Sequence, residues 1–96
     1  MQQSIGVNNG SVTPMDKSIY SAEYGIFLKT IRDIRKKANI TQEHLAEKLG
    51  TTQTVISKCE RGERRLDVIE LRAWCRALGI EFEEFASLLE AAIKQR

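Results

Sequence analysis

Apolar residues recur along most of this chain at intervals of three and four positions, which is typical of amphipathic helices. No segment shows the apolar and polar alternation of a strand. The pattern predicts five helices, of which the first runs from about Ser21 to Ala38 and the last from about Phe82 to Lys94. The three short helices between them are each bounded by a capping residue and a glycine: Thr41 and Gly50, Thr52 and Gly62, Asp67 and Gly79. We therefore expect a compact, all-α, five-helix domain.

The first 18 residues differ from the rest of the chain. They contain the only proline, with several glycine, asparagine, serine and threonine residues, and they show no hydrophobic periodicity. Such a composition is typical of a flexible segment. We expect a flexible tail over residues 1–18 and a single domain over residues 19–96, which is large enough to fold without disulfides or metals.

The two short helices between residues 41 and 62 carry the most informative pattern. Leu45 and Leu49 mark the apolar face of the first, and Ile56 and Cys59 mark that of the second. The opposite face of the second helix collects amide, hydroxyl and cationic side chains: Gln53, Thr54, Ser57 and Lys58. The major groove of DNA admits a helix and presents hydrogen-bonding groups that these side chains can meet. The pattern therefore favours recognition of DNA.

Landmarks between residues 35 and 79 resemble the helix-turn-helix of the Cro and phage-repressor family, also called the xenobiotic-response-element (XRE) type. The matching residues are Arg35, Thr41, Gln42, Leu45, Ala46, Leu49, Gly50, Gln53, Ile56, Ser57, Glu60, Arg61, Gly62, Leu78 and Gly79. The departures from the usual pattern are His44, Cys59, Leu66 and Cys75. The resemblance implies a transcriptional regulator with a lambda-repressor-like DNA-binding domain, whose helix-turn-helix core spans residues 41–62.

Individual residues can be given roles on this basis. The resemblance implies an ion pair between Arg35 and Glu60, which would hold the reading helix in place. Gln53 can make a bidentate bond to adenine, and Lys58 can donate to guanine. The full set expected to read bases is Gln53, Thr54, Ser57 and Lys58. The set expected to bind the DNA backbone is Gln42, Thr52, Arg61, Arg64 and Arg65.

Charge is unevenly distributed, although the net charge is only +2. Residues 29–65 contain ten Lys or Arg and five Asp or Glu, whereas residues 81–90 contain four Glu and no base. A basic front and an acidic rear would orient the molecule toward phosphates. Ordinary solvated helix faces would account for part of this asymmetry.

The last helix has more apolar residues than a single core-facing stripe requires. In the helix before it, we expect Val68 on the inward face, and Ile69 and Trp74 off that face. Surplus apolar surface of this kind predicts a homodimer, which would read a palindromic operator with two-fold symmetry. The alternative is that the first helix covers these residues within one chain. The expected dimer interface comprises Leu88, Leu89 and Ile93.

Other chemistries find little support in the sequence. It contains no nucleophile paired with a base and no phosphate-binding loop, so we expect no enzyme, no catalytic residue and no cofactor. His44, the only histidine, is expected on the surface at a helix start. Cys59 and Cys75 are expected to be buried and reduced, and with one histidine they do not complete an ordinary zinc site.

The remaining expectations concern location and partners. No apolar run is long enough to cross a bilayer and no signal peptide opens the chain, so we expect a cytoplasmic protein. The favoured function is that of a small repressor that binds a double-stranded, palindromic operator. A controller of a restriction–modification system and a prophage repressor are variants of this interpretation. The alternative is an antitoxin that binds a toxin protein and regulates its own operon.

Overall fold

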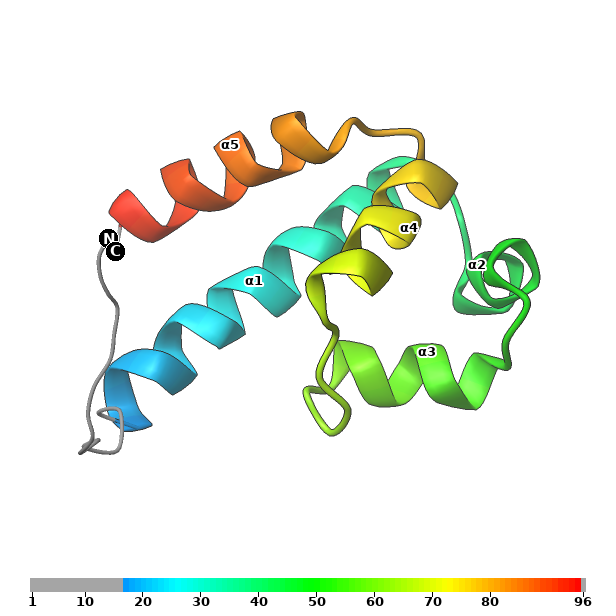
Figure 1. Cartoon of the computed structure of the whole chain (residues 1–96), viewed down its shortest axis with the longest axis horizontal. Helices are drawn as coiled ribbons and strands as arrows, with labels where there is room; N and C mark the ends of the chain where they lie inside the picture. The colour runs from blue at the N-terminus through cyan, green and yellow to red at the C-terminus, as the bar shows by residue number, and fades with distance from the viewer. Residues whose placement is uncertain (1–16, 96) are drawn as a thin grey trace.

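The computed structural model describes residues 17–95, and side chains from residue 21 onward. Within this part of the chain there are five α-helices and no strand, as the pattern predicted (Figure 1). They are α1 (Lys17–Lys37), α2 (Gln42–Leu49), α3 (Gln53–Glu60), α4 (Val68–Leu78) and α5 (Phe82–Lys94). The all-α, five-helix fold class is therefore confirmed.

The first helix begins earlier than expected. It starts at Lys17 rather than near Ser21, and it continues through Gly25 without interruption. Residues 17 and 18, which were predicted to be part of the tail, therefore belong to α1. Residues 1–16 lie outside the described part of the chain. At its other end α1 stops at Lys37, and Asn39, with a φ of 59°, turns the chain toward α2.

The short helices are bounded by local interactions that the sequence indicated. The hydroxyl of Thr41 accepts a hydrogen bond from the His44 amide at 3.0 Å, and that of Thr52 accepts one from the Val55 amide at 3.2 Å. Asp67 and Glu70 form a reciprocal capping box at the start of α4. These caps satisfy amide groups that would otherwise lack partners at each helix start. They place α2, α3 and α4 within one residue of the predicted bounds.

The core joins all five helices. Phe85 of α5 is 1% exposed, and its ring meets that of Phe27 of α1 edge-on, with centroids 5.8 Å apart. Burying a side chain of this size contributes ~1.5–3 kcal/mol. Figure 1 shows the result, with α5 lying along α1 and α4 in front of α1, while α2 and α3 occupy the other side of the molecule. The buried apolar residues are Phe27, Ile31, Leu45, Ala46, Ile56, Cys59, Trp74, Cys75, Leu78 and Phe85.

The inward face of α4 differs from the expected one. Trp74 is 4% exposed and belongs to the core, whereas Val68 is 60% exposed. The face of α4 that packs on the core is rotated relative to the predicted one. It consists of residues at helical spacing: Leu71, Trp74, Cys75 and Leu78. Val68 is the first residue of α4 and lies beyond the end of that stripe. Ile69 is 72% exposed, as predicted.

Candidate nucleic-acid interface

A tight turn between α2 and α3 creates the helix-turn-helix. Gly50 adopts a left-handed conformation with φ of 69°, and the Thr51 amide donates to the Ala46 carbonyl at 2.9 Å. Ala46 and Ile56 are both buried, so the inner surfaces of the two helices pack into the core. The outer face of α3 therefore stays open, and in Figure 1 no other element covers its lower side. On this face Gln53, Thr54 and Lys58 are exposed and Ser57 is half-buried.

A buried ion pair anchors the C-terminal end of α3 to α1. The guanidinium of Arg35 donates to both carboxylate oxygens of Glu60, at 2.6 Å from Nε and 3.0 Å from Nη2. Its third contact runs from Nη1 to the Ile40 carbonyl at 2.9 Å. Arg35 is 8% exposed and Glu60 is 4% exposed. The two residues for which the resemblance implied a pair thus lie together, and both are shielded from solvent.

Two glutamines extend this ion pair to the outer face of α3. Gln42 Nε2 donates to Glu60 Oε1 at 2.9 Å, and Gln53 Nε2 donates to Gln42 Oε1 at 2.7 Å. We call the series Arg35–Glu60–Gln42–Gln53 the polar relay. The relay fixes the orientation of the Gln53 side-chain amide by using one of its N–H groups. The other N–H and Oε1 take part in no hydrogen bond within the described residues. An acceptor and a donor side by side are the pair that bidentate bonding to adenine requires.

The loop after α3 holds its arginines in contacts that the sequence did not suggest. Arg61 donates to both oxygens of Glu63, at 2.8 and 3.2 Å, and to the Ser57 hydroxyl. Arg64 donates to Glu70 at 2.7 Å and to the Cys59 sulfur at 3.5 Å. The guanidinium of Arg61 lowers the pKa of Glu63, and that of Arg64 lowers the pKa of Glu70, because a nearby positive charge stabilises the ionised carboxylate.

The third loop arginine behaves differently. The guanidinium carbon of Arg65 lies 4.1 Å from the centre of the Tyr24 ring, in cation–π geometry. Sequence reasoning missed Tyr24, Glu63 and Glu70 as neighbours of this loop. The spacing of Arg61 and Glu63 was visible, but residues two apart do not meet on a regular helix. They meet here because Gly62, with φ of 79°, reverses the chain between them.

The residues expected at a dimer interface have unequal exposure. Leu88 is 45% exposed, whereas Leu89 and Ile93 are half-buried. Leu89 packs against the core, so it already serves the fold of the single chain. Leu89 and Ile93 also line an apolar groove between α1, the start of α4 and α5. The other residues of this groove are Glu23, Tyr24, Phe27, Leu66, Asp67, Val68 and Leu71.

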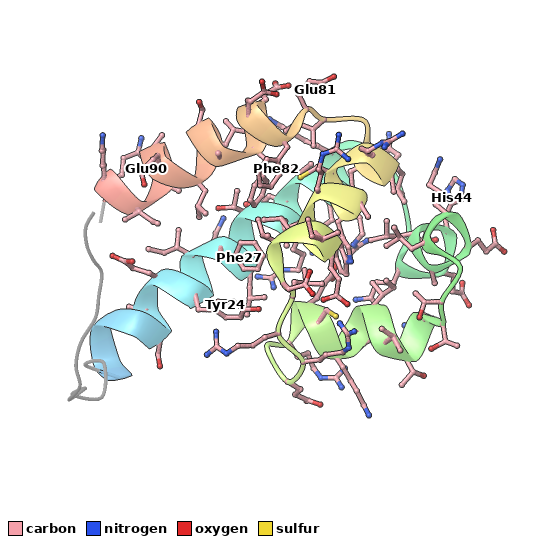
Figure 2. All side chains as sticks on the ribbon, in the orientation of Figure 1. Tyr24, Phe27, His44, Glu81, Phe82 and Glu90 are labelled. Atoms are coloured by element: carbon pink, nitrogen blue, oxygen red, sulfur yellow. The ribbon has the colours of Figure 1, made fainter. Side chains whose placement is uncertain are left out.

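The acidic side chains of α5 lie away from α3. In Figure 2, Glu90 of α5 and Glu81, the residue before α5, lie at the upper edge of the molecule, while α3 forms the lower edge. Glu83 and Glu84 lie in the first turn of the same helix and are exposed. The open face of α3 therefore points away from the main acidic surface, which suits an approach to a polyanion.

Several other features of the described residues bear on function. Cys59 and Cys75 are buried free thiols, and burial raises the pKa of Cys75. Residues 17–95 contain no group of three or more His, Cys, Asp or Glu side chains that could hold a metal ion. In the same part of the chain, no helix has the length and apolar character needed to span a bilayer. His44 is exposed at the start of α2, at the right edge of Figure 2.

Comparison with known proteins identifies the fold. A helix-turn-helix family model matches residues 31–85. The chain is 38% identical over 60 residues to an uncharacterized HTH-type transcriptional regulator of Methanothermobacter thermautotrophicus, a match that covers 62% of this chain and 87% of the relative.

Two solved structures are also similar. An XRE-family like protein from Pseudomonas syringae pv. tomato str. DC3000 is 44% identical with a TM-score of 0.74, covering 78% of this chain and 92% of that one. The wild-type restriction–modification controller protein C.Esp1396I is 28% identical with a TM-score of 0.71, covering 77% and 96%. The family match spans more than half of the chain, and the helices and their turns agree with it. The chain therefore belongs to the XRE-type helix-turn-helix family of DNA-binding transcriptional regulators.

Proposed function

We propose that this protein is a repressor that binds an operator in duplex DNA by inserting the outer face of α3 into the major groove. The observation that carries the proposal is the polar relay, which links a buried ion pair to an exposed amide on that face. A side chain that reads a base discriminates better between bases when its donor and acceptor are already oriented before DNA binds. The relay supplies such an arrangement at Gln53.

The other residues of the outer face have complementary roles in this proposal. Lys58 is exposed and its ammonium forms no hydrogen bond or ion pair with the described side chains, so it is available to guanine. Thr54 and Ser57 bond bases or nearby phosphates. Thr52 and Gln42 stand at the starts of α3 and α2, where helix amide groups favour a phosphate oxygen. Arg61, Arg64 and Arg65 contact the DNA backbone from the following loop.

We further propose that two copies bind together through α5. Two apolar parts of α5 are available to a second copy: the exposed side chain of Leu88, which lines a hollow with Ile34 and Ala92, and the groove at Leu89 and Ile93. A two-fold dimer places two α3 helices on the same side of the duplex, so the operator is palindromic. Occupation of such a site blocks access to an overlapping promoter, which is the basis for the repressor assignment.

The same groove favours one other candidate, an antitoxin that holds a toxin protein against α1, α4 and α5. Both candidates bind DNA with α3, so DNA binding does not separate them. The discriminating observation is an adjacent gene whose product stops growth when expressed alone and is neutralised when this chain is co-expressed. Absence of any such effect for both neighbouring genes would favour the dedicated repressor.

Enrichment of bound sequences from a random duplex pool tests the main proposal. The wild type should enrich one inverted-repeat sequence. Gln53→Ala and Lys58→Ala should each weaken binding to that sequence by ~1–3 kcal/mol and relax the preference at one base position per half-site. Lys36→Ala is the matched control, since it removes an equal charge from an exposed position of α1. Wild-type affinity and preference in both α3 variants would show that this face does not read bases.

A further inference from the structure

The loop after α3 carries two arginine–carboxylate pairs, although it is expected to bind phosphate. Arg61 and Glu63 pair at 2.8 Å, and their side chains are 52% and 54% exposed. Arg64 and Glu70 pair at 2.7 Å, with side-chain exposures of 44% and 35%. Each pair therefore lies where DNA could reach it. Two of the cations assigned to the backbone are already neutralised before DNA binds.

In each pair the carboxylate competes with a DNA phosphate for the same guanidinium. A guanidinium binds a carboxylate and a phosphate with the same forked geometry, so the two anions contend for one site. Exposed ion pairs contribute little to stability, and a correctly placed phosphate can displace the carboxylate. A poorly placed phosphate cannot do so, and it meets a repulsive negative charge instead. Lys58 forms no such pair with the described side chains, although its charge helps to lower the pKa of Glu63.

The Arg61 pair is also connected to the reading face. Arg61 Nη1 donates to the hydroxyl of Ser57, which is one of the residues assigned to base reading. A rotation of the Ser57 side chain toward a base or a phosphate would break this contact and remove one of the bonds that hold Arg61. This contact would link recognition by α3 to release of Arg61 from the loop.

We propose that Glu63 and Glu70 are specificity-determining residues, which withhold Arg61 and Arg64 from the phosphates of non-operator DNA and release them in the operator complex. The inference rests on the proposed DNA-binding function. On an operator, the base contacts fix one register in which phosphates lie within hydrogen-bond reach of both arginines. On other sequences no register is fixed, so the arginines keep their carboxylate partners and electrostatic binding is weaker.

The test uses a Glu63→Gln, Glu70→Gln double variant, which removes both competing charges and keeps the side-chain shapes. Glu70 also accepts a hydrogen bond from the Asp67 amide at 3.0 Å, and glutamine can accept the same bond within a capping box. The fold should therefore be retained, which a thermal melt checks. The matched control is Glu83→Gln, Glu84→Gln, which makes an equal charge change on exposed residues of α5.

Binding is measured to the selected operator and to a random-sequence duplex of equal length over a range of salt concentrations. We expect the loop variant to bind random duplex on the order of tenfold more tightly, with the salt slope of log K steeper by ~0.9 for each arginine that gains a phosphate. Affinity for the operator should change less, so the ratio of the two affinities falls. The α5 control should leave that ratio unchanged.

The outcomes separate this inference from the function on which it rests. A wild type that enriches no sequence would refute the proposed function, and the present inference with it. If the wild type selects an operator but the loop variant tightens binding to operator and random duplex equally, only the role of Glu63 and Glu70 is refuted. The same conclusion follows if neither affinity changes. The single variant Glu63→Gln provides a second measurement should the double variant be less stable.

Discussion

At the scale of single residues, Arg35 connects three parts of the chain. Its guanidinium bonds Glu60 at the end of α3 and the Ile40 carbonyl between α1 and α2, while the residue itself belongs to α1. The contacts with Glu60 are buried, so removal of one partner leaves a charge without compensation. The same carboxylate also orients Gln42, so the stability of the domain and the geometry of its reading face depend on one side chain, Glu60.

We predict that Glu60→Gln destabilises the domain by ~3–5 kcal/mol, because the guanidinium of Arg35 would remain buried without its counter-charge. Asp33→Asn provides the control, since Asp33 pairs with Lys29 at 2.7 Å but both side chains are more than half exposed. Loss of that pair should cost ~1 kcal/mol or less. Urea unfolding monitored by circular dichroism measures both values. Equal costs for the two variants would mean that burial does not set the strength of the Arg35–Glu60 pair.

At the scale of the helices, local signals proved more informative than the apolar pattern alone. The bounds of α2, α3 and α4 could be predicted because a cap joins groups only three residues apart. The positions of Val68 and Trp74 could not, since helical spacing leaves a choice between adjacent stripes and packing of α4 against its neighbours decides it. For this reason Trp74 was wrongly placed outside the core.

In the candidate site, too, local patterns could be predicted and contacts made by tertiary packing could not. The polar face of α3 follows from spacing within one helix, and the sequence indicated all four of its residues. The contacts of the loop arginines depend on a turn at Gly62 and on the distance between the loop and α4, neither of which has a local pattern. Glu63 and Glu70 were therefore not recognised as partners of Arg61 and Arg64. A sequence can indicate which cations are present more readily than which of them are already paired.

The turn at Gly62 leads to a prediction about the end of α3. A Cβ added at Gly62 would lie 3.0 Å from Leu28 Cδ1, whereas one added at Gly50 would meet nothing within 4 Å. Both glycines have positive φ, so an alanine at either position carries a conformational cost of ~1–2 kcal/mol. Gly62→Ala should therefore destabilise the domain more than Gly50→Ala in thermal unfolding. The same loss in both variants would show that Leu28 moves aside freely.

At the scale of the whole molecule, the two charged surfaces lie on different sides. The open face of α3 and the loop that follows it lie at one edge, and α5 with Glu90 lies at the other (Figure 2). A second copy that docks on α5 would therefore leave both α3 helices accessible to DNA. The apolar side chains of α5 are not equally available to a second copy. Leu89 already packs within its own chain, whereas Leu88 is exposed.

We predict that Leu88→Glu dissociates the proposed dimer without unfolding the chain, since this exposed side chain contributes little to the core. Ser87→Glu adds the same charge one residue earlier, on an exposed position that lies with Ala86 and Glu90, and should leave the dimer intact. Sedimentation velocity measures the association of both variants.

The proposed dimer would also fix the geometry of the operator. Its two copies of α3 would enter successive major grooves on one side of the duplex, so the centres of the inverted half-sites should lie ~34 Å apart or a multiple of that distance. Leu88→Glu should then lose tight binding to the full operator while keeping weak binding to one half-site, because each monomer still carries an intact α3. Half-site spacings in the enriched sequences test the distance directly. A wild type that sediments as a monomer, both free and on a single asymmetric site, would rule out this assembly.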